Sequence, residues 1–137
     1  MDSSILIVEE NNKGLRDRMA VNLAREGFRV TTATDCEDAL LKLGEAKPEL
    51  VILGDGLLVD SNLACRQLRQ RSNAIILMLG ADPSGESWTS AVAAGADFYL
   101  VRPFSSLELV ARVKNMLRRY KLTRDNGYAR ESDHVEV

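Results

Sequence analysis

The feature that most constrains the fold is the alternation of short apolar runs with longer segments of helical period. The runs are mostly rich in valine and isoleucine, which is typical of parallel strands buried on both faces. Predicted strands lie near residues 4–9, 28–33, 49–53, 74–79 and 97–101. Predicted helices lie near residues 12–26, 36–46, 61–71, 85–94 and 105–120. Strands followed by helices in this way predict a three-layer α/β fold with a doubly wound, five-stranded parallel sheet.

The carboxyl ends of four predicted strands are where we expect the functional site. Ligands of open parallel sheets bind outside these ends. The residues found there are Glu9 and Glu10, Gly54, Gly80, and Arg102 followed by Pro103. Two of these four ends, Gly54 and Gly80, are glycines and therefore supply no side chain for chemistry.

Size and composition are those of one soluble domain. The chain has 137 residues, of which 45% are hydrophobic and 28% are charged. Its net charge of −2 gives no overall attraction to nucleic acid or to an anionic membrane. The first four residues lead directly into a predicted strand without a basic or long apolar leader, so we expect a cytoplasmic protein. Cys36 and Cys65 lack the spacing of a redox or zinc motif, which favours free thiols.

The predicted domain covers residues 1–120, and residues 121–137 form a predicted linker or tail. This tail is polar and has no periodic pattern until it ends in Val-Glu-Val at 135–137. That ending alternates like the start of a strand. We therefore expect the chain to have been cut at a domain boundary, with a further output domain beyond it.

Four segments, in order, resemble the receiver domain of two-component response regulators. They are Ile-Leu-Ile-Val-Glu-Glu at 5–10, Pro-Glu-Leu-Val-Ile-Leu at 48–53, Ile-Ile-Leu-Met-Leu-Gly-Ala at 75–81 and Ala-Gly-Ala-Asp-Phe-Tyr-Leu-Val-Arg-Pro-Phe at 94–104. The resemblance runs from about residue 3 to residue 120 and implies a flavodoxin-like sheet of strand order 2-1-3-4-5. The segment at 106–119 resembles receivers of the OmpR/PhoB type. It implies transcription control through a C-terminal DNA-binding domain.

The family's phosphorylation site needs an acidic pair and an acceptor aspartate around Mg²⁺, together with a hydroxyl residue and a lysine. The resemblance places the acidic pair on Glu9 and Glu10, the acceptor on Gly54, the hydroxyl residue on Gly80 and the lysine on Arg102. Only the acids and one positive charge remain, which predicts a degenerate receiver that has no catalytic residue and is not an enzyme. No cofactor is expected. Glu9 and Glu10 are weak candidates for binding Mg²⁺.

Asp55 is the alternative acceptor, displaced by one position from Gly54. Successive strand side chains project in opposite directions, so we expect Asp55 to point away from Glu9 and Glu10. The longer acids are expected to use the room left by the glycines at strand ends. Arg102 is expected to pair with one of these acids in place of the metal, and the resemblance implies a cis peptide bond after Arg102.

The resemblance also implies a two-fold dimer face formed by the fourth helix, fifth strand and fifth helix. The resemblance places the charged contacts of this face on Asp97, Glu108 and Arg112. Trp88 and Phe98 stand where the family has a basic and an acidic residue, and Tyr99 stands at the position of the family's switch aromatic. The aromatic replacements add apolar area where charges are expected, which favours a homodimer. Alternatively, Trp88 and Phe98 are ordinary core residues. With Gly80 in place of the hydroxyl residue, nothing couples the Tyr99 ring to phosphate.

Two classes of function remain. The favoured one is an atypical receiver that regulates by phosphorylation-independent dimerisation or by binding a ligand or partner. The alternative is a phosphorylatable receiver that uses Asp55 and Mg²⁺. A nucleotide-binding enzyme is disfavoured because neither Gly-x-Gly-x-x-Gly nor a P-loop follows the first strand. The basic residues at 112–124 are typical of a solvated helix face, so this domain is not expected to contact nucleic acid.

Overall fold

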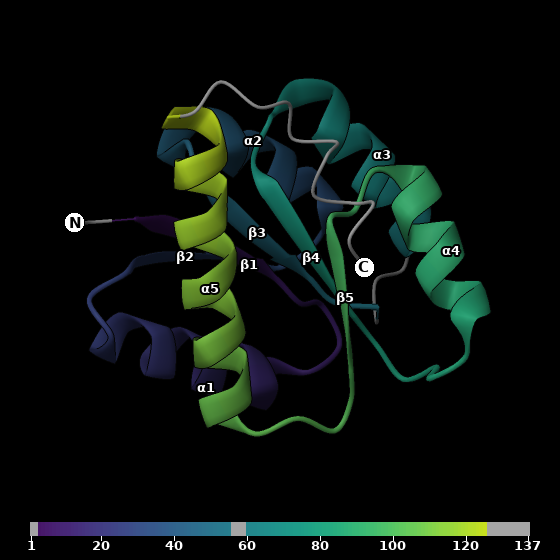
Figure 1. Ribbon diagram of the computed structural model, residues 1–137, viewed down its shortest axis with the longest axis horizontal. Helices are drawn as coiled ribbons and strands as arrows, with labels where there is room; N and C mark the ends of the chain where they lie inside the picture. The colour runs from purple at the N-terminus through teal and green to yellow at the C-terminus, as the bar shows by residue number, and fades with distance from the viewer. Residues whose placement is uncertain (1–2, 56–59, 126–137) are drawn as a thin grey trace.

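The computed structural model describes residues 3–55 and 60–125 and shows a three-layer α/β fold (Figure 1). The strands are β1 (Ser4–Val8), β2 (Arg29–Ala33), β3 (Leu50–Leu53), β4 (Ile75–Gly80) and β5 (Phe98–Val101). The helices are α1 (Lys13–Arg25), α2 (Cys36–Ala46), α3 (Ser61–Arg71), α4 (Gly85–Ala94) and α5 (Ser106–Asp125). All strand pairs are parallel, in the order β2-β1-β3-β4-β5, so the predicted fold class is confirmed.

Two apolar cores lie on opposite faces of the sheet. Ile5 and Ile7 of β1 pack with residues of α1 and α5, whereas Leu6 and Val8 pack with residues of α2, α3 and α4. This division follows from the period of two along a strand. Because both faces are covered, the central strands β1, β3 and β4 are buried along their whole length and carry one polar side chain, Ser4 at the start of β1.

Short polar side chains begin the helices where the sequence places them. Asn12, Asp35 and Ser105 each accept a hydrogen bond from a backbone N–H three residues further along, at 2.8–3.0 Å. Gly95 ends α4 with a φ of 111°, a left-handed conformation that favours glycine. These caps fix the loops that follow the strands.

The parallel register brings four strand ends to one edge of the sheet. Val8 is aligned with Leu53, Leu53 with Met78, and Gly80 with Val101. Backbone hydrogen bonds join Gly54 N–H to the Val8 carbonyl and Arg102 N–H to the Gly80 carbonyl. The residues that follow β1, β3, β4 and β5 are therefore neighbours.

Helix α5 differs from its predicted length. It ends at Asp125 rather than near residue 120, so the predicted linker begins as helix. Residues 121–125 continue the helix because a polar composition does not by itself end one. The rest of the predicted tail, including Val-Glu-Val at 135–137, lies outside the described residues.

The two cysteines are free and buried, as expected. Burial raises the pKa of the Cys65 thiol to about 11, so this side chain is an uncharged part of the core at neutral pH. Across the described residues, no helix combines the length and the apolar composition that crossing a bilayer requires.

Candidate functional site

The Glu9 carboxyl group takes the space above Gly54. A Cβ atom added to Gly54 would lie 2.9 Å from Cδ of Glu9 and closer still to its Oε1 atom. Glu9 is only 1% exposed and is therefore enclosed at the end of β1. The acid that the resemblance assigns to the acidic pair thus fills the position where an acceptor side chain would begin.

Arg102 joins Glu9 to Asp55. Its Nη2 atom lies 2.5 Å from Oδ1 of Asp55 and 3.6 Å from Oε1 of Glu9. The expected pairing of Arg102 with an acid of the first strand is found, and its partner is Glu9. The peptide bond after Arg102 is cis, as the resemblance implies.

The predicted direction of Asp55 is wrong. Instead of pointing away from Glu9, its carboxylate shares the guanidinium group of Arg102 with it. Strand β3 ends at Leu53, so the alternation of side chains does not extend through Gly54 to Asp55. The side chain of Asp55 is 36% exposed and lies at the rim of the site.

Burial controls the ionisation of Glu9. It is the main cause that raises the pKa of the Glu9 carboxyl above its ordinary value; the charge of Arg102 opposes this effect and the charge of Asp55 adds to it. Oε1 of Glu9 and Nε of Arg102 are buried without a hydrogen-bond partner among the described residues. Glu9 and Arg102 therefore form an ion pair without a direct hydrogen bond between them.

This arrangement does not fit a magnesium ion. Mg²⁺ requires near-octahedral oxygen ligands at about 2.1 Å. Here Nη2 of Arg102 already contacts both carboxylates, so a positive group occupies the place where the metal would be held. Within residues 3–55 and 60–125, no group of three or more acidic, histidine or cysteine side chains is placed to bind a metal.

Tyr99 fills the corresponding space at Gly80. A Cβ atom added to Gly80 would lie 2.5 Å from Cζ of Tyr99 and even closer to its hydroxyl oxygen. The room left by this glycine is therefore used by the Tyr99 ring, and not by Glu9 or Glu10 as expected. The ring position depends on the absence of a side chain at residue 80.

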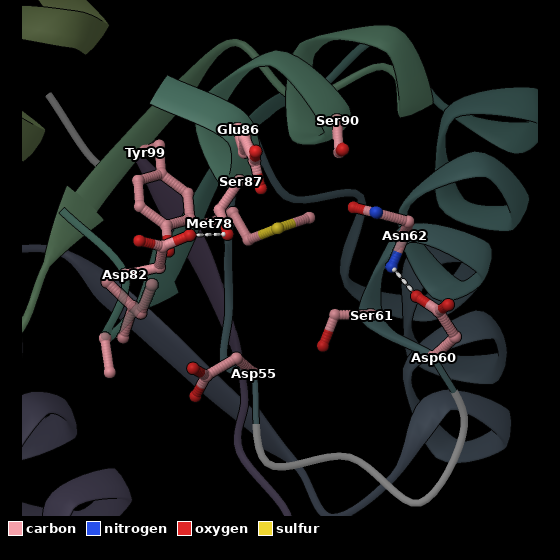
Figure 2. Close-up of a pocket in the computed structure, with 12 residues that line it drawn as sticks. Asp55, Asp60, Ser61, Asn62, Met78, Asp82, Glu86, Ser87, Ser90 and Tyr99 are labelled. Atoms are coloured by element: carbon pink, nitrogen blue, oxygen red, sulfur yellow. Dashed lines mark hydrogen bonds between the residues drawn. The ribbon is translucent and has the colours of Figure 1, made fainter. Parts of the chain in front are cut away.

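An open hollow of about 500 Å³ lies beside these strand ends (Figure 2). Figure 2 shows Asp55 and Ser61 on the side of β3 and α3, with Glu86, Ser87 and Ser90 on the side of α4. Its acidic lining residues are Asp55, Asp60, Asp82 and Glu86. No basic residue is among the described residues that line it, so the hollow is acidic.

Sequence reasoning singled out Asp55 but missed Asp60, Asp82 and Glu86. These three lie in loops or first helical turns that follow β3 and β4. Asp82 accepts hydrogen bonds from Ser87 Oγ at 2.6 Å and from the N–H and Oγ of Ser84 at 2.8 and 2.9 Å. The Ser87 bond is the largest of the causes that lower the pKa of Asp82. Reading past the strand ends to the next helix would have found all three.

A groove of about 330 Å³ opens on the face formed by α4, β5 and α5. Trp88, Phe98 and Tyr99 line it, with Arg112 as its basic residue. All three aromatic side chains are partly exposed, so Trp88 is not an ordinary core residue and Phe98 only flanks the core. Glu108 and Arg112 lie one helical turn apart on α5 and are 3.5 Å from each other.

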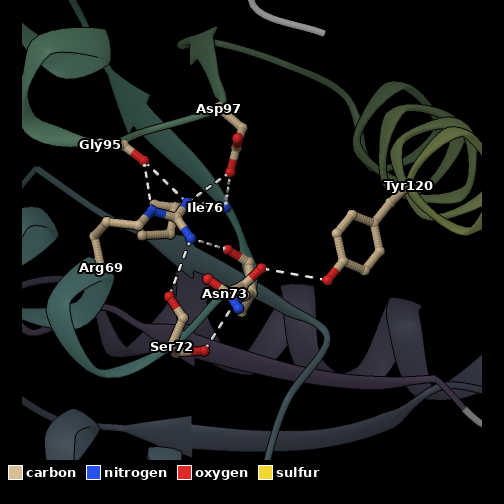
Figure 3. Close-up of polar contacts among 8 residues, drawn as sticks. Arg69, Ser72, Asn73, Ile76, Gly95, Asp97 and Tyr120 are labelled. Carbon is tan, nitrogen blue, oxygen red and sulfur yellow. Dashed lines mark hydrogen bonds and ion pairs between the residues drawn. The ribbon is translucent and has the colours of Figure 1, made fainter. Parts of the chain in front are cut away.

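Asp97 does not belong to this face, which corrects its assignment as a dimer contact. It is 3% exposed, and its Oδ2 atom accepts hydrogen bonds from Arg69 Nη2 and from the N–H of Ile76, both at 2.8 Å. Figure 3 shows the Arg69 guanidinium group enclosed by Asp97 and by carbonyl groups, including that of Gly95. Asp97 precedes β5 and points inward, where it joins α3 to the sheet.

Two curated relatives of the chain are named as transcriptional regulatory proteins. It is 41% identical over 121 residues to the phosphate regulon transcriptional regulatory protein PhoB of Rhizobium meliloti (strain 1021), covering 85% of this chain and 53% of PhoB. It is 38% identical over 125 residues to the alkaline phosphatase synthesis transcriptional regulatory protein PhoP of Bacillus subtilis (strain 168), covering 89% of this chain and 51% of PhoP. The chain spans about half the length of these relatives.

Two solved structures share the fold. A two-component response regulator from Clostridium difficile matches with a TM-score of 0.81 and 28% identity, covering 87% of this chain and 98% of that one. NtrX from Brucella abortus, in complex with ATP, matches with a TM-score of 0.82 and 27% identity, covering 93% of this chain and 29% of NtrX. The sequence pattern of the family described as "Response regulator receiver domain" matches residues 5–114. The chain belongs to the receiver domain family of two-component response regulators.

Proposed function

We propose that this domain is an atypical receiver that regulates without being phosphorylated. The observation that carries the proposal is the Glu9 carboxyl group in the space above Gly54, paired with Arg102. An acceptor needs an exposed carboxylate with a neighbouring metal. In this domain the acid at that place is buried, and its counter-charge is an arginine.

The surrounding charge supports the same proposal. Phosphodonors are anions, and the hollow beside the strand ends is lined by four carboxylates. Like charges in a hollow lower the local concentration of an anion. Arg102, which lies at this edge, already contacts two acids. The transition-state charge of a phosphoryl group would therefore not have Arg102 as a free positive partner.

The proposed output is control of transcription from the cytoplasm. The named relatives are transcriptional regulators of which the match covers about half, which supports a further DNA-binding domain in the full-length protein. Regulation then depends on self-association, or on a ligand or partner, at the face formed by α4, β5 and α5. No membrane contact and no direct nucleic-acid contact of this domain are part of the proposal.

Labelling with a small phosphodonor tests the proposal. Incubation with acetyl phosphate and Mg²⁺ is expected to leave the intact mass unchanged, because no free acceptor with a metal is present. A receiver with an ordinary acceptor aspartate, treated in the same way, serves as the positive control. Added Mg²⁺ is also expected to leave the urea midpoint of unfolding unchanged.

Asp55 carries the second candidate function. Its carboxylate is partly exposed and lies beside Arg102, which favours it over any other described acid near Gly54 as a displaced acceptor. If Asp55 were the acceptor, a phosphoryl group would appear in the mass spectrum and disappear in the Asp55→Asn variant. That pair of results would replace the proposed function with a phosphorylatable receiver.

A further inference from the structure

The groove between α4, β5 and α5 is mainly apolar, and Arg112 is the one cation among the described residues that line it. We propose that it binds a planar aromatic anion of one or two fused rings, whose acid group pairs with Arg112. This inference builds on the proposed function, because it names a ligand class to which a receiver without phosphorylation could respond. It does not require the domain to dimerise.

The shape and lining of the groove suit a small planar ligand. Leu77 of β4 is fully buried among the lining residues, while Trp88, Phe98 and Tyr99 supply three aromatic rings. The volume of about 330 Å³ is at the small end of the usual range for ligand pockets. Aromatic side chains favour offset-stacked or edge-to-face contacts with another ring. A ligand of one or two rings can make several such contacts at once.

The charges of the groove select an anion. Arg112 is the one basic residue among the described residues that line it. Its side chain is 55% exposed, and its ion pair with Glu108 is long, at 3.5 Å. The guanidinium group can therefore turn to a ligand acid group and bind it through two parallel hydrogen bonds.

A cationic ligand is the obvious competitor, since aromatic rings also attract cations. The one acid in the lining, Asp82, is poorly placed to help such a ligand. Ser84 and Ser87 already donate three hydrogen bonds to its two carboxylate oxygens, and Figure 2 shows the bond to Ser87. Arg112 would in addition repel a cation, so the groove favours the anion.

The position of the Tyr99 ring, which forms one wall of the groove, depends on Gly80. Tyr99 lines both the groove and the acidic hollow, and its ring lies where a Cβ of residue 80 would be. Any side chain at residue 80 would force the ring to move. The groove is therefore expected to lose its present shape when Gly80 acquires a side chain.

Three probes of equal shape and different charge test the proposal: 2-naphthoate, 2-naphthylmethanol and 2-naphthylmethylammonium. Binding is followed by calorimetry and by the indole N–H resonance of Trp88, the one tryptophan of the chain. We expect 2-naphthoate to shift this resonance and to bind at least ten-fold more tightly than the alcohol, with the ammonium compound weakest. Equal affinities, or a preference for the ammonium compound, would overturn the proposal.

Matched variants assign the effect to the groove. Arg112→Gln is expected to lower the affinity for 2-naphthoate to that for the alcohol, while Arg118→Gln on the exposed side of α5 leaves it unchanged. Gly80→Ala is expected to weaken binding at least ten-fold. Gly44→Ala is its control, because nothing lies within 4 Å of the added Cβ. Circular dichroism reports whether each variant is folded.

The remaining outcomes also decide the matter. An indole resonance that responds to protein concentration but not to 2-naphthoate would show a second copy of the chain in the groove and contradict the ligand proposal. Calorimetric binding without any shift of the Trp88 resonance would place the ligand elsewhere. Either failure leaves the phosphodonor experiment unaffected, so the ligand proposal and the proposed function can fail separately.

Discussion

Glu9 is a buried acid whose environment opposes its charge. Taking a carboxylate out of water costs several kcal/mol unless a counter-charge and hydrogen bonds compensate. Arg102 supplies the counter-charge at 3.6 Å, which is too long for a hydrogen bond. The raised pKa of Glu9 shows that compensation is incomplete. Two substitutions separate the contributions of the two partners.

Replacing Arg102 with alanine is expected to lower the free energy of unfolding by roughly 1–3 kcal/mol, because Glu9 would remain buried without its counter-charge. Urea denaturation at neutral pH measures the change. Arg118→Ala is the control, since Arg118 is exposed on α5. An unchanged midpoint for Arg102→Ala would mean that Glu9 is compensated by water.

Replacing Glu9 with glutamine is expected to change how stability depends on pH. Since the folded-state pKa of Glu9 is raised, the folded state binds its proton more tightly than the unfolded chain. The stability associated with this proton is complete below the ordinary value near 4.5 and is lost as pH rises through the raised pKa. Glutamine at residue 9 does not titrate. The free energy of unfolding of Glu9→Gln, measured relative to that of the parent, should therefore increase as pH rises through this interval.

Urea titrations between pH 4 and pH 8 measure the difference between the two proteins. Glu45→Gln, which changes an exposed acid on α2, provides the baseline. A difference that stays constant with pH would show that Glu9 ionises normally. A difference of opposite slope would show that Arg102 outweighs burial.

At the scale of elements, Arg69 connects three parts of the fold. From α3 it donates hydrogen bonds to the carbonyl groups of Ser72 and Ala74 before β4, to that of Gly95 after α4, and to the carboxylate of Asp97 before β5. The close approach of Arg69 to Gly95 also requires a residue without Cβ: an added Cβ would lie 3.0 Å from Arg69 Cγ. This network fixes α3 and α4 against the same end of the sheet.

Arg69→Ala is expected to lower the free energy of unfolding by roughly 2–4 kcal/mol, because Asp97 and several carbonyl groups lose the hydrogen bonds that Arg69 donates to them. Arg69→Lys should recover only part of the loss, since an ammonium group lacks the planar fork. Chemical denaturation measures both, with Arg66→Ala on the exposed side of α3 as the control. If Arg69→Lys were as stable as the parent, the ion pair with Asp97 would account for the stabilisation and the hydrogen bonds to the carbonyl groups would not.

The sequence predicted the elements well because their signals are local. Apolar period, helix caps and Gly95 depend on neighbouring residues, and they placed every strand and helix of the described chain apart from the end of α5. Side-chain directions beyond the strand ends depend on partners distant in sequence. Asp55 turned to Arg102, and Asp97 turned to Arg69, for reasons that neither local segment contains.

The two glycines illustrate the same limit at the candidate site. The sequence shows that Gly54 and Gly80 lack side chains, but it does not show which neighbours enter the vacated space. Glu9 and Tyr99 do so from β1 and β5, because the parallel register brings these strands beside β3 and β4. The sequence therefore identifies the two positions that lack a side chain. The packing of the structure identifies the side chains that fill the space beside them.

At the scale of the whole molecule, the face of α4, β5 and α5 is expected to mediate self-association without phosphorylation when no ligand occupies its groove. Trp88, Phe98 and Arg112 lie on this face and are partly or fully exposed. In a two-fold dimer each of them would be used twice. If the domain is not phosphorylated, as we propose, it can obtain a conformational preference only from its own contacts or from another ligand.

Analytical sedimentation is expected to show a dimer of micromolar affinity or tighter. Trp88→Ala and Arg112→Glu should each shift it to monomer while the circular dichroism spectrum stays native. Leu41→Ala, an exposed apolar change on α2, is the control. A protein that stays monomeric at hundreds of micromolar, or a dimer insensitive to both variants, would exclude this face as the site of association.

The occupied space above Gly54 also bears on how the domain could change through mutation. Changing the Gly54 codon to one for aspartate would not by itself create an acceptor, because the new Cβ would meet the Glu9 carboxyl group. Glu9 would first have to shorten or turn outward, which would leave Arg102 with Asp55 as its partner. An acceptor at residue 54 therefore requires the Glu9 side chain to move as well as the change at residue 54 itself. The history of residue 54 is thus linked to that of residue 9: the side chain at one position determines the space open to the other.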